Sequence, residues 1–286
     1  MALKAFRLAR SLGCRVMHIG GGEPFLRFEE LLKCCEAAQE AGVAVEYVET
    51  NSSWFKSMDE AVEMLKELKR RAVSTLLVSI SPFHNEYIPF SRVQGVMEAC
   101  RRAGISIFPW SSDFIQDLGM LDPSRPHKMK EYQELFGRDY LYSIPSRYWI
   151  VMRGRALDTF AGMLPEAATE QIVSNASGGC RELLDTSHFH IDLYGRYLPG
   201  LCSGLGIRLD DLAKPLVPEE YPVIHALLSK GPGGLLEMAG DLGFKPAPMY
   251  RSKCHLCQEV RTHLIRHAPG RFHELSPPWF YEDHPG

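Results

Sequence analysis

Four cysteines in the second half of the chain are the residues whose type and spacing best suit metal chemistry. Cys254 and Cys257 form a Cys-x2-Cys pair, and this spacing lets two thiolates reach one metal from a tight turn. Cys180 and Cys202 flank a predicted β-hairpin at 188–202 with Tyr-Gly at its turn, which brings Cys202 back towards Cys180. Four thiolates suit a 4Fe–4S cluster or a structural zinc ion. We therefore predict one metal site at these four cysteines, and the alternative is that they share no metal.

The other cysteines and the histidines near the hairpin are weaker candidates. Three of these cysteines fall on predicted helices among apolar neighbours, where a thiol usually packs as a small apolar group. The histidines are possible replacement ligands, although we expect them beside the metal or on the surface. These residues are Cys34, Cys35 and Cys100, and His188, His190 and His255.

A glycine-rich turn near the start of the chain is the second feature with chemical potential. Gly21-Gly22-Glu23-Pro24 follows the apolar strand pattern 15–19 and precedes a helical pattern. Glycine allows a sharp turn and a close approach to a ligand, and Glu23 adds a carboxylate. Ligands of α/β folds bind at the carboxyl ends of parallel strands. By spacing alone, a structural turn explains the motif equally well.

Alternating strand and helix patterns position these residues. Up to about residue 155 the chain alternates strand patterns with helix patterns, which indicates an α/β fold with a parallel sheet and right-handed crossovers. Residues 111–147 are less regular and are predicted to form a long connection. The predicted strands are 15–19, 44–50, 75–79, 105–110 and 148–152, and the predicted helices are 1–12, 28–41, 58–70 and 91–103.

Together these motifs resemble the radical S-adenosylmethionine (SAM) enzyme superfamily. A strand that ends in Gly-Gly-Glu-Pro resembles the second strand of that family, and the cysteine hairpin resembles its SPASM and twitch extensions. The resemblance implies a partial (βα)6 barrel of the radical-SAM type, similar to a TIM barrel, with a small cysteine-rich C-terminal extension. It also implies SAM bound at Gly21, Gly22, Glu23 and Pro24, and an auxiliary 4Fe–4S cluster at the four cysteines, with zinc as the alternative.

Polar residues that follow the next two strands complete the cofactor site that the resemblance implies. Asn51 follows the strand 44–50, and Ser79, Ser81 and His84 lie at or after the end of the strand 75–79. In the resembling family such positions contact SAM. The alternative is that Ser and Asn at these positions only cap the next helices.

The family's Cys-x3-Cys-x2-Cys loop is missing from this chain. Only Cys14 precedes the glycine turn, and 1–12 has the pattern of a helix that Gly13 ends. We expect a truncated enzyme or a relative that has lost radical chemistry. The predicted domains are a partial barrel at 1–157, the cysteine-rich extension at 158–270 and a surface or disordered tail at 271–286.

The composition of the chain argues against several classes of protein. The formal charge of −3 argues against a general nucleic-acid binder. No apolar run reaches the ~20 residues that span a membrane, and no secretory signal is visible. Eight cysteines in a chain of 286 residues without such a signal favour a reducing cytoplasm over a disulfide framework.

The function that the resemblance implies is radical-based modification of a peptide or small molecule, with an electron donor such as ferredoxin or flavodoxin. Without the three-cysteine loop, this chain alone is not expected to cleave SAM reductively. The alternative from another class is a non-catalytic scaffold or binding protein with a four-cysteine metal site. A third possibility is an ordinary α/β-barrel enzyme that merely contains the glycine turn.

Overall fold

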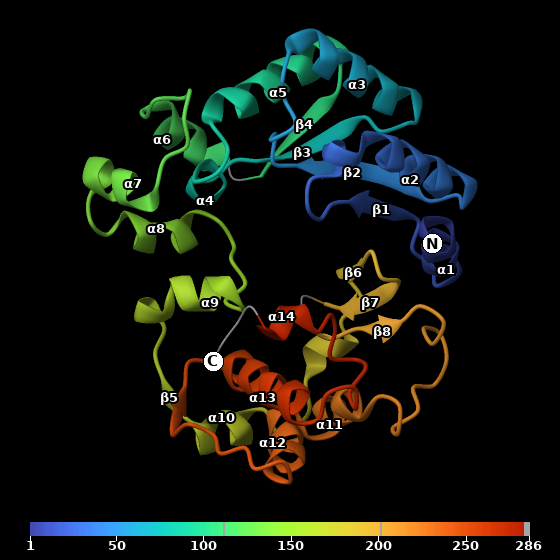
Figure 1. Ribbon diagram of the computed structural model, residues 1–286, viewed down its shortest axis with the longest axis vertical. Helices are drawn as coiled ribbons and strands as arrows, with labels where there is room; N and C mark the ends of the chain where they lie inside the picture. The colour runs from blue at the N-terminus through green and yellow to red at the C-terminus, as the bar shows by residue number, and fades with distance from the viewer. Residues whose placement is uncertain (111, 201, 283–286) are drawn as a thin grey trace. The chain divides into compact units, whose positions relative to one another are not determined.

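The computed structural model describes residues 1–110, 112–200 and 202–282. The chain divides into two compact units, Met1–Trp149 and Ile150–Gly286, which Figure 1 colours from blue to green and from yellow-green to red. We call them unit 1 and unit 2 and describe each separately. The three predicted domains, 1–157, 158–270 and 271–286, stay a prediction.

Unit 1 is built on a four-stranded parallel sheet. Its strands are β1 (Val16–Ile19), β2 (Ala44–Thr50), β3 (Thr75–Ser79) and β4 (Ser106–Trp110), in the order β1-β2-β3-β4. The chain order equals the spatial order because each crossover returns the next strand to the same growing edge. The predicted α/β class and the first four predicted strands are therefore confirmed. No closure of this sheet into a barrel is found in the described part of the chain.

Amphipathic helices fill the crossovers of unit 1. They are α1 (Ala2–Ser11), α2 (Phe28–Glu40), α3 (Met58–Arg70) and α5 (Phe90–Ala103), and Figure 1 shows α3 and α5 side by side along the sheet. The Ser57 side chain caps α3 by accepting a hydrogen bond from the Glu60 amide. Leu65 and Leu68, one turn apart on α3, are fully buried. These helices bury one apolar stripe each and leave their charged face to solvent.

The region between β4 and unit 2 differs from the prediction. Residues 111–147 were expected to be irregular, but they include α6 (Ile115–Gly119), α7 (Met129–Phe136) and α8 (Tyr140–Arg147). The predicted strand 148–152 is wrong, because no strand forms there. Tyr, Trp, Ile and Val favour strands only where a sheet edge supplies backbone partners. Here the Arg153 amide instead donates to the nearby Val151 carbonyl.

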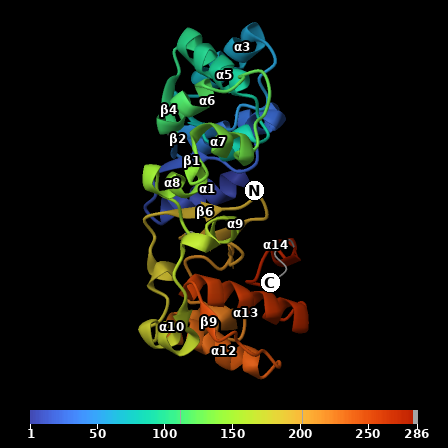
Figure 2. The ribbon, with the colours of Figure 1, turned by 90° about the vertical axis from the view of Figure 1, so that its left-hand side faces the viewer.

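Unit 2 is mainly helical and also contains a three-stranded sheet and a two-stranded sheet, both antiparallel. A hairpin of β6 (Phe189–Ile191) and β7 (Arg196–Pro199) turns at residues 192–195 as predicted. Figures 1 and 2 show α13 packed beside α12. The remaining elements are β5 (Ala167–Ala168), β8 (Ile207–Arg208) and β9 (Met249–Tyr250), and α9 (Arg155–Thr159), α10 (Thr169–Asn175), α11 (Pro222–Lys230), α12 (Pro232–Gly240), α13 (Lys253–His267) and α14 (Trp279–Glu282).

Residues that we expected in a surface or disordered tail belong to the core of unit 2. Phe272, Leu275 and Tyr281 are buried, and they join the apolar cluster of α11, α12 and α13. Burial of aromatic side chains is worth more than leaving them in water, so this segment packs inward. In the described part of the chain, no helix combines the length and the apolar character that crossing a membrane requires.

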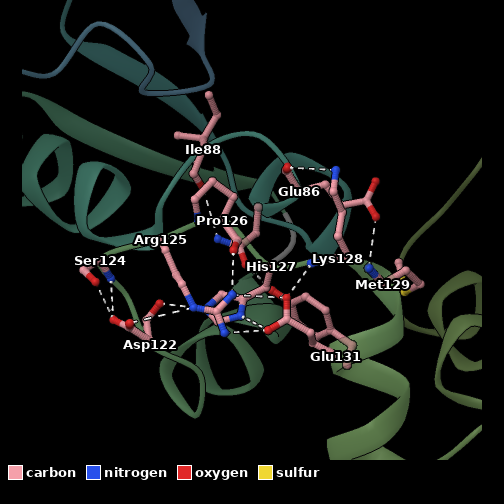
Figure 3. A network of polar contacts seen from close by, with 12 residues as sticks. Glu86, Ile88, Asp122, Ser124, Arg125, Pro126, His127, Lys128, Met129 and Glu131 are labelled. Carbon is pink, nitrogen blue, oxygen red and sulfur yellow. Dashed lines mark hydrogen bonds and ion pairs between the residues drawn. The ribbon is translucent and has the colours of Figure 1, made fainter.

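A buried histidine organises the loop before α7 (Figure 3). The His127 ring lies with Nδ1 at 2.9 Å from Glu131 Oε2 and Nε2 at 2.7 Å from the Asp122 carbonyl oxygen. Arg125 Nη2 donates to the same Glu131 carboxylate at 2.6 Å. The Glu131 carboxylate and the Asp122 carbonyl oxygen that face the His127 ring are both hydrogen-bond acceptors. The network fixes the loop onto the first turn of α7.

We predict that His127→Gln loosens this loop. The substitution removes the contacts of the ring with the Glu131 carboxylate and the Asp122 carbonyl oxygen, which hold the loop against α7. Hydrogen-exchange mass spectrometry should show faster exchange over residues 120–136 in this variant than in the wild type. Lys130→Gln, at an exposed position of α7, serves as the matched control, and equal protection in the two variants would contradict the assigned role.

Candidate metal centre

Three separate segments of unit 2 carry the four cysteines that the sequence singles out. Cys254 and Cys257 lie one turn apart in the first turns of α13, which Ser252 caps by accepting from the His255 amide at 3.1 Å. Cys180 precedes a short 3-10 helix, and its amide donates to the Leu227 carbonyl at 2.7 Å. Cys202 follows β7 and donates its amide to the Pro199 carbonyl at 3.1 Å. Backbone contacts thus fix the position of each sulfur-bearing residue.

All four cysteines line one cavity of about 450 Å³. Part of its wall is apolar and includes Leu183, Leu227 and two aromatic residues of α14, Trp279 and Phe280. Cysteines separated by up to 77 residues in sequence (257 − 180) therefore face a common space. The structure brings together all four residues that we predicted as metal ligands.

Cationic side chains also line this cavity. Arg153 is half-buried and acts electrostatically on Cys254 and Cys202. Lys253 pairs with Glu182 at 2.5 Å, and the Cys180 thiol donates to the other Glu182 oxygen at 3.2 Å. Arg155 and Arg261 also line the cavity, and Arg261 follows Cys257 by four residues on α13. The lining therefore carries more positive than negative charge.

The environment keeps two of the thiols protonated when nothing binds them. Burial raises the pKa of Cys180 to about 12, and the Glu182 carboxylate adds to the rise. Burial likewise raises the pKa of Cys257 to about 11, although Arg261 opposes that rise. A metal that binds these sulfurs must displace their protons, as in other thiolate sites.

The glycine turn of unit 1 has a structural role that accounts for its sequence. Gly21 and Gly22 have φ values of 82° and 58°, which side chains disfavour. The turn aims the Glu23 carboxylate at the end of β2, where it accepts from the Asn51 amide at 2.7 Å and the Thr50 hydroxyl at 3.0 Å. It also accepts from the Phe25 amide at 3.2 Å. Glu23 therefore ties the end of β1 to the end of β2.

The remaining residues predicted to bind a cofactor lie at the same edge of the sheet, after β2 and β3. The Asn51 side chain accepts from the Ser53 amide at 2.9 Å. Ser81 caps the short helix α4 (Pro82–Asn85), and its hydroxyl lies 2.8 Å from His84 Nδ1. Burial lowers the pKa of His84. The capping interpretation is confirmed for Ser81, whereas ligand binding at Gly21, Gly22, Glu23, Pro24, Asn51, Ser79, Ser81 and His84 stays a prediction.

Sequence reasoning missed the charged lining of the cysteine cavity. Arg261 follows Cys257 by four residues, a spacing that puts both on one face of a helix. Lys253 directly precedes Cys254. These spacings were visible in the sequence, but they do not reveal that the Arg261 side chain is buried.

Comparisons with known proteins give no family for this chain. No protein-family model matches it, and no curated protein matches it. A solved structure that it is similar to is a sugar phosphate isomerase/epimerase from Parabacteroides distasonis ATCC 8503. The sequence identity is 16%, the TM-score is 0.25, and the match covers 52% of this chain and 67% of the other. A similarity at this level says nothing about the activity of this chain.

The predicted membership of the radical SAM superfamily is wrong. No family model of that superfamily matches the chain and no curated protein matches it, so the comparisons give no support to SAM binding or to an iron–sulfur or SPASM assignment. The physical reason is that Gly-Gly-Glu-Pro is a short motif. The hydrogen bonds of Glu23 within the sheet edge explain this motif without a cofactor. The predicted radical reaction is withdrawn with the family.

We predict that Glu23 makes the stability of unit 1 depend on pH. Burial raises the pKa of Glu23 above its ordinary value of 4.5, so the folded state holds this proton more tightly than the unfolded state. The resulting stabilisation is complete below pH 4.5 and is lost as the pH rises through the raised pKa. Glu23→Gln cannot ionise. In urea titrations, the unfolding free energy of the wild type relative to Glu23→Gln should therefore fall as the pH rises.

A difference between the two proteins that stays constant from pH 4 to pH 7.5 would contradict this assignment. Glu29→Gln, at an exposed position in the first turn of α2, is the matched control and should show no such trend.

Proposed function

We propose that unit 2 is a metal-binding module and that Cys180, Cys202, Cys254 and Cys257 are its ligands. The observation that carries the proposal is the convergence of these four thiols on one cavity. Structural cysteines that only pack are usually enclosed by apolar side chains. Here the thiols instead share their cavity with cationic groups. The proposal covers any metal centre that four thiolates hold.

The charge of the cavity supports the proposal. Four thiolates around a divalent ion carry a net charge of about −2. The cavity is lined by Arg153, Arg155, Lys253 and Arg261 and by the single carboxylate of Glu182, which pairs with Lys253. The arginines of this lining can compensate an anionic metal–thiolate group.

The identity of the metal is the question that follows. In tetrahedral zinc sites the Zn–S distance of about 2.3 Å puts the sulfurs roughly 3.8 Å apart. Among the described residues, no three of these sulfurs lie within 4.8 Å of one another. Zinc would therefore require the sulfurs to move closer together, whereas a 4Fe–4S cluster is larger and requires a wider spacing. Both are thiolate centres, and the experiment below separates them.

The finer architecture of unit 1 is also a proposal. We infer that its sheet is part of a six-stranded (βα) barrel. The support is that β1 to β4 are parallel and follow one another in chain order, as the strands of such barrels do.

We predict that the chain purified without oxygen contains a metal that depends on the CxxC pair. Elemental analysis of iron and zinc, with sulfide determination, should find about four irons and four sulfides or about one zinc per chain. Cys254→Ala/Cys257→Ala should lose that metal. Cys14→Ala/Cys34→Ala removes two cysteines of unit 1 instead, and it should keep the metal.

Each outcome is informative. Iron with sulfide identifies a cluster, and zinc alone identifies a structural ion. Absence of metal from the wild type after anaerobic supply of iron, sulfide and zinc would overturn the proposal. Equal metal content in the two double variants would show that the metal lies elsewhere.

A further inference from the structure

Arg261 is a buried cation in the wall of the cysteine cavity. Its side chain is only 5% exposed. Its Nη1 donates to the Ser203 carbonyl at 3.0 Å and to the Tyr281 hydroxyl at 3.2 Å, and its Nε donates to the Cys257 carbonyl at 3.4 Å. The Tyr281 hydroxyl in turn donates to the Gly204 carbonyl. The guanidinium is thus fixed in position from several sides.

The partners of this guanidinium are two carbonyl oxygens and a hydroxyl, and all three are neutral. Among the residues that the structure describes, no carboxylate lies within ion-pair distance of Arg261. A buried charge without a counter-charge is strongly destabilising, so proteins pair such charges or place them near metal groups. Arginine also stays protonated in proteins, because its guanidinium does not lose its proton. Its charge must therefore be compensated from nearby.

Tyr281 and three of the cysteines are the ionisable groups that act on Arg261, and burial raises the pKa of the Tyr281 hydroxyl, which keeps it neutral. The three cysteines are Cys257, Cys202 and Cys254, and Arg261 lines the same cavity as they do. A bound metal keeps these sulfurs as thiolates. The metal-bound form therefore contains the negative charge that the guanidinium lacks otherwise.

We infer that Arg261 is the counter-charge of the metal–thiolate group and that it couples metal retention to the stability of unit 2. This inference rests on the proposed metal site. Arg261 is a positioning residue: it does not bind the metal but compensates the charge of the metal–thiolate group from the cavity wall. With metal bound, the guanidinium and the thiolates compensate each other. Without metal, no metal–thiolate group compensates the charge of the buried guanidinium, which then destabilises the fold.

This role predicts that replacing Arg261 has opposite effects on the metal-bound and the metal-free protein. Arg261→Met keeps most of the side-chain volume and removes the charge. The metal-bound variant should release its metal to EDTA at least tenfold faster than the wild type, because removal of one partner of a buried charge pair is costly. The metal-free variant should resist unfolding as well as the metal-free wild type or better. A residue that only filled space would weaken both forms alike.

The experiment uses the full chain, purified without oxygen, and two comparison variants. Release of the copurified metal to EDTA is followed by elemental analysis. Stability of metal-free protein, prepared under reducing conditions, is followed by hydrogen exchange of α13 amides. Arg261→Lys keeps the charge and should restore slow metal release at least in part. Arg266→Met, at an exposed position of the same helix, should behave as the wild type in both assays.

The outcomes separate this inference from the proposed function. A wild-type chain that binds no metal overturns the proposed function and the inference with it. If the wild type binds metal but Arg261→Met releases it no faster than the wild type does, the inference alone is overturned. Arg261→Lys releasing metal as fast as Arg261→Met would show that charge is not the cause. Equal loss of stability in both forms of Arg261→Met would leave Arg261 a packing residue.

Discussion

Unit 2 encloses the charged Arg261 guanidinium together with cysteine thiols, and the arrangement of its other segments depends on this constraint. The Arg261 guanidinium and the buried Cys257 thiol lie on one helix, and three further segments must approach α13 to complete their surroundings. Packing alone gives no reason to bury an arginine, since methionine or leucine would fill the same volume without a desolvation cost. The segments that bear Cys180, Cys202 and Tyr281 therefore surround a polar interior that an ordinary apolar core does not require.

Unit 1 illustrates the opposite arrangement, in which the Glu23 carboxylate and the His127 ring find their polar partners within the protein itself. Both oxygens of the Glu23 carboxylate accept hydrogen bonds from the protein, and Thr50 relays the network to the buried Trp54 indole. His127 is likewise enclosed by acceptors from its own loop and from α7. Such satisfied networks rigidify a fold. They also explain why conspicuous polar residues at a sheet edge need not mark a ligand site.

How well a feature could be predicted from the sequence depends on how far apart in the chain its interacting residues lie. Strands β1 to β4 and the long helices were predictable, because their apolar periodicity is local. The strand expected at 148–152 was wrong because strand formation requires a partner edge, which a sequence pattern does not supply. The convergence of Cys180 and Cys202 was predictable from the hairpin. The role of Glu23 was not, because Thr50 and Asn51 lie 27 and 28 residues away, and neither was the burial of Arg261.

The position of the cavity wall in the chain has a consequence for biosynthesis. Trp279 and Phe280 line the cavity, and Tyr281 joins that wall to Arg261. Translation proceeds from the N-terminus, so all four cysteines are synthesised before these aromatic residues. The cavity is therefore enclosed only after residues 279–281 have been added and have folded against α13.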